Sequence, residues 1–138
     1  GTANGGHSVG IQFDTITTNN TSLIGRAQGS LYNVGVQCNV ISGNNVAEGY
    51  LEIYGDSSES TSSSIGVQLE EFGVSGTADI LVTGRTNNED GSIGVNINEG
   101  TTIRGASLSI DGTGAIGCFV GTSNFEVASI TLDGTSEA

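Results

Sequence analysis

The sequence predicts an all-β protein, a parallel β-solenoid of about five coils, on three observations. A five-residue motif with apolar residues at its first, third and fifth positions occurs five times in 138 residues. A second motif, which ends in glycine, follows it in each unit in intact or degenerate form. No segment shows an apolar period of 3.6 residues, so no helix is expected. Stacked units of this kind bury apolar rows that no unit could bury alone.

The first motif defines the five repeat units of a single domain over residues 1–138. It reads VGIQF at Val9–Phe13, VGVQC at Val34–Cys38, IGVQL at Ile65–Leu69, IGVNI at Ile93–Ile97 and IGCFV at Ile116–Val120. Alternation over five residues predicts a strand with one buried face. The predicted core columns are Val9, Ile11, Phe13, Val34, Val36, Cys38, Ile65, Val67, Leu69, Ile93, Val95, Ile97, Ile116, Cys118 and Val120.

The second motif predicts a second strand in each coil. It reads LEIYG at Leu51–Gly55, ILVTG at Ile80–Gly84, LSIDG at Leu108–Gly112 and ITLDG at Ile130–Gly134, with a degenerate copy at Gly25–Gly29. Isolated apolar residues between the two motifs suggest a third, irregular side. They are Ile16, Val40, Phe72, Val74, Ile103, Phe125 and Val127. The alternative fold is an antiparallel β-sandwich or jelly roll, whose strands do not normally repeat their sequence so regularly.

Positions 2 and 4 of the first motif are predicted to form two columns on the outer face. A strand glycine often marks close approach of another backbone, and stacked amides can form a hydrogen-bonded ladder. One interpretation is a flat lateral docking face for a neighbouring rod. The other is that glycine relieves crowding in a tight coil while the amides face water. The residues are Gly10, Gln12, Gly35, Gln37, Gly66, Gln68, Gly94, Asn96, Gly117 and Phe119.

The composition argues against several classes of partner. Three basic residues against 15 acidic ones give a formal net charge of −12, so we expect no binding to nucleic acid. No apolar run approaches the roughly 20 residues of a membrane span, so no membrane insertion is expected. The absence of lysine, the abundance of Ser, Thr, Asn and Gly, and the acidity favour an extracellular or cell-surface location.

The sequence does not predict an enzyme. His7 is the only histidine, and it lies in a stretch faintly similar to one in β-helical polygalacturonases. Those enzymes also need paired aspartates and a basic substrate-binding motif. Here adjacent acids occur only as Glu70–Glu71 and Glu89–Asp90, and no lysine is present. We therefore expect no catalytic residues.

Three turn aspartates are weak candidates for calcium ligands. Asp90, Asp111 and Asp133 offer the hard oxygen atoms that calcium prefers. The same segments are also ordinary turn sequences, and they lack the nonapeptide pattern of calcium-binding β-rolls. No other metal or cofactor is expected.

Two cysteines and two asparagines are candidates for covalent modification. Cys38 and Cys118 fall on the predicted inner face, three coils or ~14 Å apart, and a disulfide needs Cα atoms within about 7 Å. We therefore expect both to be buried thiols. Asn19 and Asn20 begin two overlapping N-glycosylation sequons, which matter only in a glycosylating secretory host.

The recurring [VI]-G-[VI]-[QN] and [LI]-x-[IVL]-x-G motifs suggest a family. They resemble the repeat regions of large extracellular β-solenoid surface proteins, the filamentous-haemagglutinin-like and autotransporter-passenger-like adhesins. This resemblance implies a role in stalks, adhesins or matrix fibres.

A solenoid also presents open strand edges at its ends. We therefore expect a structural subunit or segment of an extracellular fibre, stalk or matrix filament. Its partner is then another copy stacked head-to-tail, or neighbouring repeats of a longer chain. The alternative is an adhesin or glycan-binding module, and a β-helical carbohydrate-active enzyme is less favoured.

Overall fold

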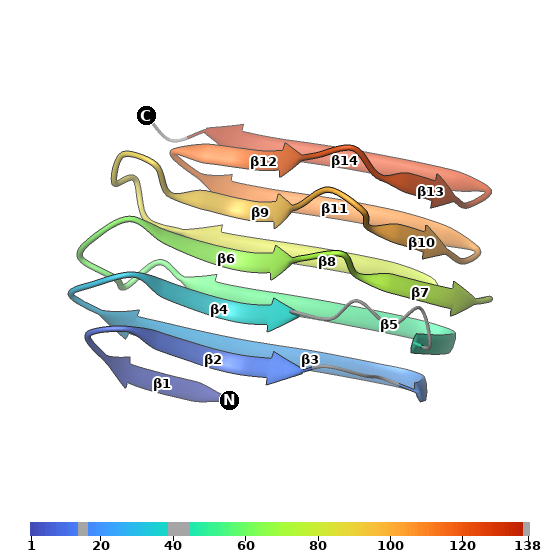
Figure 1. Ribbon diagram of the computed structural model, residues 1–138, viewed down its shortest axis with the longest axis horizontal. Coiled ribbons are helices and arrows are strands. Elements are labelled where there is room, and N and C mark those ends of the chain that lie inside the picture. Colours follow the sequence, from blue (N-terminus) through green and yellow to red (C-terminus); the bar gives the residue numbers. More distant parts are fainter. Residues whose placement is uncertain (14–16, 39–44, 137–138) are drawn as a thin grey trace.

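The structure is a computed structural model that describes residues 1–13, 17–38 and 45–136. Its strands stack in parallel as successive coils of a solenoid, and no helix occurs among the described residues (Figure 1). Every described strand pair is parallel. The predicted all-β parallel solenoid is therefore confirmed, and the antiparallel sandwich is wrong.

The first motif forms a five-stranded sheet, called sheet B here. Each strand lies above the preceding copy in register, so that Val36 pairs with Ile11 below and Val67 above. The chain completes four turns between the first and last strands of this sheet. The strands are β2 (Ser8–Phe13), β4 (Asn33–Cys38), β6 (Ser64–Leu69), β9 (Ile93–Ile97) and β12 (Ile116–Val120).

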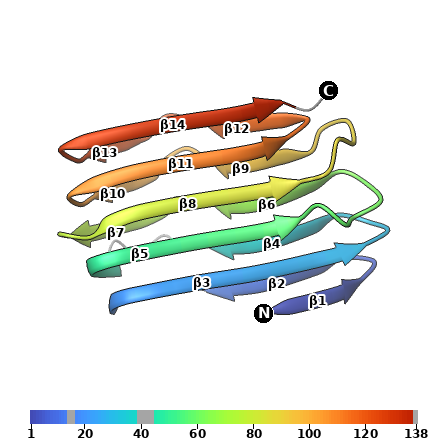
Figure 2. The ribbon, with the colours of Figure 1, turned by 180° about the vertical axis from the view of Figure 1, so that it is seen from behind.

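The second motif lies on the long strands of the other sheet, called sheet A here (Figure 2). These strands are β3 (Thr17–Gly29), β5 (Asn45–Ser57), β8 (Asp79–Thr86), β11 (Ser107–Gly114) and β14 (Ser129–Ser136), preceded by β1 (Thr2–Gly5). Three short strands, β7 (Gly73–Gly76), β10 (Thr102–Arg104) and β13 (Asn124–Glu126), stack beside one another and belong to the same sheet. They correspond to the predicted third side, whose Ile16 and Val40 lie outside the described residues.

The core lies between the two sheets. Leu51 and Ile53 of β5 and Val67 and Leu69 of β6 are fully buried and belong to one apolar cluster. Burying a side chain of this kind contributes roughly 1.5–3 kcal/mol relative to leaving it in water. Because each side chain contacts its copies above and below, stacking is what holds the coils together.

The position-2 glycines of sheet B face the interior, so their predicted place on an outer docking face is wrong. A Cβ atom on Gly66 would lie 2.4 Å from the backbone nitrogen of Arg85 and 2.5 Å from the carbonyl oxygen of Gly94. Across the interior, a Cβ atom on Gly84 would lie 1.9 Å from that same oxygen. The two backbones meet at this level and leave no room for a side chain. The facing columns are Gly10, Gly35, Gly66, Gly94 and Gly117 in sheet B and Gly25, Gly55, Gly84, Gly112 and Gly134 in sheet A.

The chain after each glycine departs from simple alternation. Pairing in sheet B joins Val34 to Ile65 and Val36 to Val67 in constant register, and it omits the intervening glycines. Gly35 meets the backbone of sheet A, and Val36 belongs to the core cluster. Since Gly35 and Val36 both face inward, Val34 lies on the opposite, outer face of the strand.

This change of direction at the glycine divides the predicted core columns into two groups. The inner columns, at positions 3 and 5, are fully buried in the middle coils and partly buried at the ends, where Val120 is exposed. The outer apolar column is position 1, which lies outside the core cluster. Its members are Val9, Val34, Ile65, Ile93 and Ile116; the second and third are buried, whereas the last is 42% exposed.

Candidate functional site

The C-terminal end of the solenoid exposes its apolar row. Ile130 and Leu132 of β14 are 52% and 58% exposed. Their register partners one coil earlier, Leu108 and Ile110, are each 1% exposed. The motif is the same in both coils. The difference arises because no described strand lies beyond the last one.

The last strand of sheet B is open in the same way. Phe119 is 52% exposed, Val120 is 36% exposed, and the Cys118 thiol is only half-buried. Among the described strands, β12, β13 and β14 each have one neighbour, so each leaves a row of backbone hydrogen-bonding groups at this end. Such an edge is a template for pairing with another chain.

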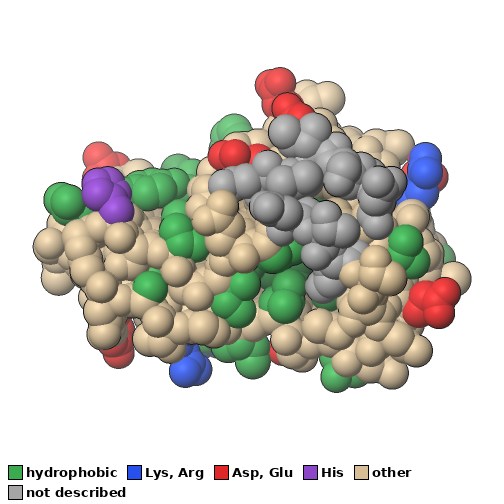
Figure 3. Space-filling model, turned by 60° about the horizontal axis from the view of Figure 1, so that its bottom comes forward, with side chains coloured by type: hydrophobic (Ala, Val, Ile, Leu, Met, Phe, Trp, Pro, Cys, Tyr) green, Lys and Arg blue, Asp and Glu red, His purple; other side chains and the backbone are tan. Residues whose placement is uncertain are grey.

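The N-terminal end has a step in it, because β1 covers only part of β3. β1 pairs with residues 26–29 of β3 in parallel register. The ammonium group of Gly1 donates a hydrogen bond to the Ile24 carbonyl at 2.7 Å, and the Arg26 nitrogen donates to the Gly1 carbonyl at 2.8 Å. The rest of β3 and the whole of β2 have no described strand below them. Hydrophobic side chains appear among polar ones when this end is brought forward (Figure 3).

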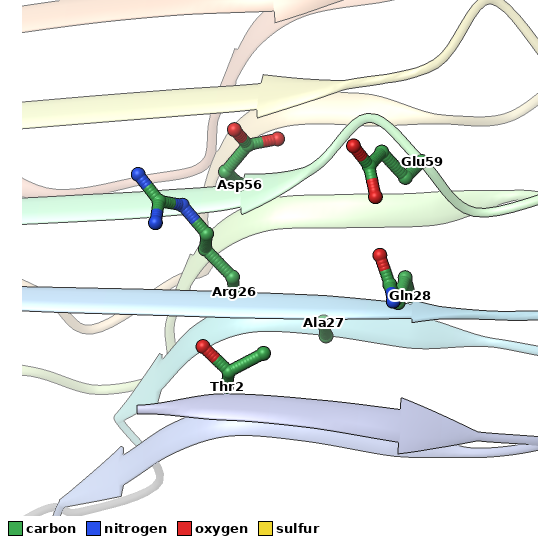
Figure 4. Close-up of a pocket in the computed structure, with 6 residues that line it drawn as sticks. All are labelled: Thr2, Arg26, Ala27, Gln28, Asp56 and Glu59. Atoms are coloured by element: carbon green, nitrogen blue, oxygen red, sulfur yellow. The ribbon is translucent and has the colours of Figure 1, made fainter.

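A polar hollow of about 350 Å³ lies where β1 meets β3 and β5. Arg26 extends from β3 toward the strand that carries Asp56, above Thr2 of β1 (Figure 4). Gln28 and Glu59 line the other side of the hollow. Its lining joins opposite charges with an amide, which suits hydrogen bonding to a polar ligand.

The amide column of sheet B makes polar contacts across the outer face. The Tyr32 hydroxyl donates a hydrogen bond to Gln68 Oε1 at 3.3 Å, and Gln68 Nε2 donates to Glu70. The contacts of this amide thus go to a phenol and a carboxylate, not to the stacked amides that a ladder requires. Burial raises the Tyr32 pKa above its usual value, and the charge of Glu70 adds to the effect.

Tyr32 spans the two coils in which the outer apolar column is buried. Its side chain reaches from the start of the second coil to Gln68 in the third coil. Val34 and Ile65, the two buried members of the column, belong to these same coils. Ile116, in the last coil, is 42% exposed.

The three candidate calcium ligands do not converge. Asp111 and Asp133 are register partners on β11 and β14, whereas Asp90 lies in the turn before β9, where its carbonyl accepts a hydrogen bond from Ser63. Within the part of the chain that the structure describes, no three side chains of His, Cys, Asp or Glu lie close enough to hold a metal ion. His7 is exposed near the N-terminal end.

The two cysteines differ in environment and are not joined to each other. Cys38 is fully buried, as predicted, but Cys118 lies at the open end and is only half-buried. The Cys118 thiol donates a hydrogen bond to the Asp133 carbonyl at 3.2 Å. Partial burial raises the Cys118 pKa above its usual value, and the charge of Asp111 raises it further.

The two sequon asparagines lie on the exposed part of β3. Asn20 has a φ of 55°, in the left-handed region that asparagine tolerates, at an irregularity in the pairing with β5. Its side-chain oxygen accepts a hydrogen bond from the Tyr50 nitrogen at 3.2 Å. Asn20 therefore has a structural role in shaping this strand.

Comparison with known proteins gives no relative: no family model, no curated protein and no solved structure matches the chain. No helix within residues 1–13, 17–38 and 45–136 is long and apolar enough to cross a bilayer. The surfaces of the molecule itself therefore carry the evidence on function.

Sequence reasoning missed two features of these surfaces. One is Tyr32, which precedes the second copy of the first motif without any repeated counterpart that would draw attention to it. The other is β1, which contains no alternating apolar residues. A signal for β1 does exist, because Gly1-Thr2-Ala3 closely matches Gly134-Thr135-Ser136.

Proposed function

We propose that this chain is a structural subunit or segment of an extracellular fibre, stalk or matrix filament that extends by stacking coil on coil. The observation that carries the proposal is the contrast between Ile130 and Leu132, which are more than half exposed, and the same positions one coil earlier, which are buried. One further coil would bury both. That coil comes from a second copy or from a longer chain.

The energetics favour a contact that uses the whole end. Completing the burial of each half-exposed apolar side chain contributes on the order of 1 kcal/mol, because about half of its area is already covered. The loss of rigid-body freedom on association opposes this by at least about 4 kcal/mol. The four exposed apolar side chains at this end therefore give only a weak contact by themselves. They are Phe119, Val120, Ile130 and Leu132. Backbone pairing along all three open strands supplies the remainder.

The net charge decides the conditions for assembly. A charge of −12 makes two copies repel each other at long range. Salt screens this repulsion, with a Debye length of about 8 Å at physiological ionic strength, and leaves short-range packing intact. Assembly through the ends should therefore be stronger at moderate salt than at low salt.

The test is negative-stain electron microscopy of the purified chain across a concentration and salt series. Thin fibres are expected for the wild type, while Leu132→Asp, which places a charge on the open end, should remain monomeric. The matched control is Leu81→Asp, because Leu81 is 37% exposed in a middle coil, away from the ends. Alkylation gives a second readout, since Cys118 should become protected when fibres form. Monomers at every concentration by sedimentation velocity would contradict assembly of separate copies and leave only a segment of a longer chain or the binding module described next.

A glycan-binding module is the second candidate function. Tyr50 is 47% exposed on the outer face of sheet A, in a groove that also includes Glu52 and Asp79. An exposed aromatic ring beside carboxylates can stack on a sugar ring and accept hydrogen bonds from its hydroxyl groups. A glycan array distinguishes the two functions: binding by a monomer, lost in Tyr50→Ala, favours the module.

A further inference from the structure

We propose that β1 is a replaceable strand, which holds on β3 the place that β14 of a second copy takes when two copies join end to end. This inference rests on the proposed function and specifies how the two ends fit together. The partner is a second copy of this chain, and the binding element is its strand Ser129–Ser136.

The pairing register carries the argument. A single column of paired residues runs through sheet A from one end to the other. It consists of Thr2, Arg26, Asp56, Arg85, Thr113 and Thr135. Thr2 and Thr135 therefore occupy the same position in the coil, at opposite ends of the solenoid. Their neighbours match too, since Gly1-Thr2-Ala3 differs from Gly134-Thr135-Ser136 only by alanine in place of serine.

Continuous stacking of two copies brings these two segments into conflict. If every column continues across the joint, β14 of the second copy pairs with β3, so that its Ile130 lies beneath Thr21 and its Leu132 beneath Leu23. Its Thr135 then falls beneath Arg26, where Thr2 already lies. One strand edge cannot hold both. If β1 stays in place, β14 of the second copy lies one level lower. A gap of one strand then separates β2 of the first copy from β12 of the second copy.

Exchange favours the incoming β14 because it is longer than β1 and carries two large apolar side chains. β1 has four residues that are exposed or only partly buried, and it pairs with β3 alone. β14 has eight residues, including Ile130 and Leu132, which would cover the half-buried Leu23 on β3. Adding a strand to an open edge gains main-chain hydrogen bonds, and alternate side chains give specificity.

Charge on the outer face is also complementary across this joint. Arg26 is exposed on β3 and lines the polar hollow beside β1. After the exchange, Asp133 of the second copy lies one strand below and two residues from it along the strand. Asp133 keeps its register partner Asp111 within its own copy, so the joint brings a positive charge near a pair of acids. Opposite charges on neighbouring strands stabilise pairing, whereas like charges weaken it.

A reversible lock on β1 tests the exchange. Thr2 and Arg26 are exposed register partners on adjacent strands, whose spacing of about 4.8 Å lies within the range of a disulfide. The double variant Thr2→Cys/Arg26→Cys is oxidised or reduced, checked for folding by circular dichroism, and followed by sedimentation and electron microscopy. The oxidised form should stay monomeric, while the reduced form assembles at least about tenfold faster.

Controls separate the lock from other effects of the variant. Arg26→Cys alone and the wild type, each with and without reductant, measure the loss of the arginine and any contribution of Cys38 and Cys118. Equal assembly of oxidised and reduced protein overturns the exchange and leaves end-to-end assembly standing. Failure of every form to assemble, the wild type included, overturns both.

A peptide of the sequence Ser129–Ser136 gives a test that needs no folded variant. Labelled peptide should bind wild-type monomer below its assembly concentration. The peptide carrying Leu132→Asp should bind at least about tenfold more weakly, because it loses the apolar contact with Leu23. Absence of peptide binding to the wild type, or equal binding of both peptides, overturns the exchange.

Discussion

The middle coils and the C-terminal coil carry the same motifs but differ in side-chain burial and in the space around their glycines. Leu51 and Ile53 are fully buried in the middle, whereas Ile130 and Leu132 in the last coil are more than half exposed. A Cβ atom on Gly84 would collide with backbone at 1.9 Å, whereas on Gly134 its nearest neighbour would be 3.3 Å away. In a solenoid, burial and crowding therefore belong to the stack and not to the single repeat.

The largest difference in stability between a middle coil and the last coil should come from replacing a glycine by alanine. The two variants are Gly84→Ala and Gly134→Ala. Gly84→Ala pushes a Cβ atom onto the Gly94 carbonyl, which belongs to the backbone and cannot move aside. We expect the free energy of unfolding to fall by about 3 kcal/mol or more. Gly134→Ala should lower it by less than about 1 kcal/mol. Urea unfolding followed by circular dichroism measures both, and equal losses would contradict the described contact between the sheets.

A smaller difference in stability is expected for truncation of two leucines at inward-facing positions of sheet A, one in a middle coil and one in the last coil. Leu51→Ala removes a fully buried side chain and should lower the free energy of unfolding by about 2–5 kcal/mol. Leu132→Ala removes one that is 58% exposed and should lower it by less than about 1 kcal/mol in dilute monomer. The difference between these two losses in free energy of unfolding should become smaller at concentrations where copies stack, because Leu132 is then covered. A difference that does not depend on concentration would count against assembly through this end.

The smallest effect concerns the ion pair that joins β10 to β13. Arg104 Nε lies 2.7 Å from Glu126 Oε2 on the exposed surface, and this hydrogen bond lowers the Glu126 pKa. Since the folded-state pKa lies below the unfolded value, the pair stabilises the protein above the usual carboxyl range. That stabilisation is lost as the pH falls through the lowered pKa. Comparing Glu126→Gln with the wild type from pH 7 to pH 3 measures it, and high salt should reduce the difference.

The two sheets show how far the sequence predicts this structure. Over the second motif in sheet A the alternation holds, so Leu51, Ile53, Ile80 and Val82 face the core as the pattern indicates. In sheet B the same rule predicts positions 3 and 5 correctly but places position 1 inside. Gly35 and Val36 both face inward, so position 1 lies on the outer face. Gly35 meets the backbone at Gly55 of the other sheet, and no alternation within a single strand reveals that contact.

The candidate sites divide in the same way. The sequence drew attention to open strand edges, and the unfinished last coil fits that expectation. The glycine column that it placed on the outer face, as a docking face or as relief of crowding, contacts the opposite sheet inside the molecule. Tyr32 and β1 came only from the structure, because each acts through a partner in another coil or at another edge.

The sequence by itself determined the repeat, the parallel register and the number of coils, because these follow from side-chain periodicity and from identical motifs that pair with their own copies. Tertiary structure decided which side of sheet B is outside, which coil is left uncovered and where β1 lies. These outcomes depend on the distance between two sheets and on the presence or absence of a neighbouring coil. Such quantities are set by packing between segments, and local patterns do not contain them.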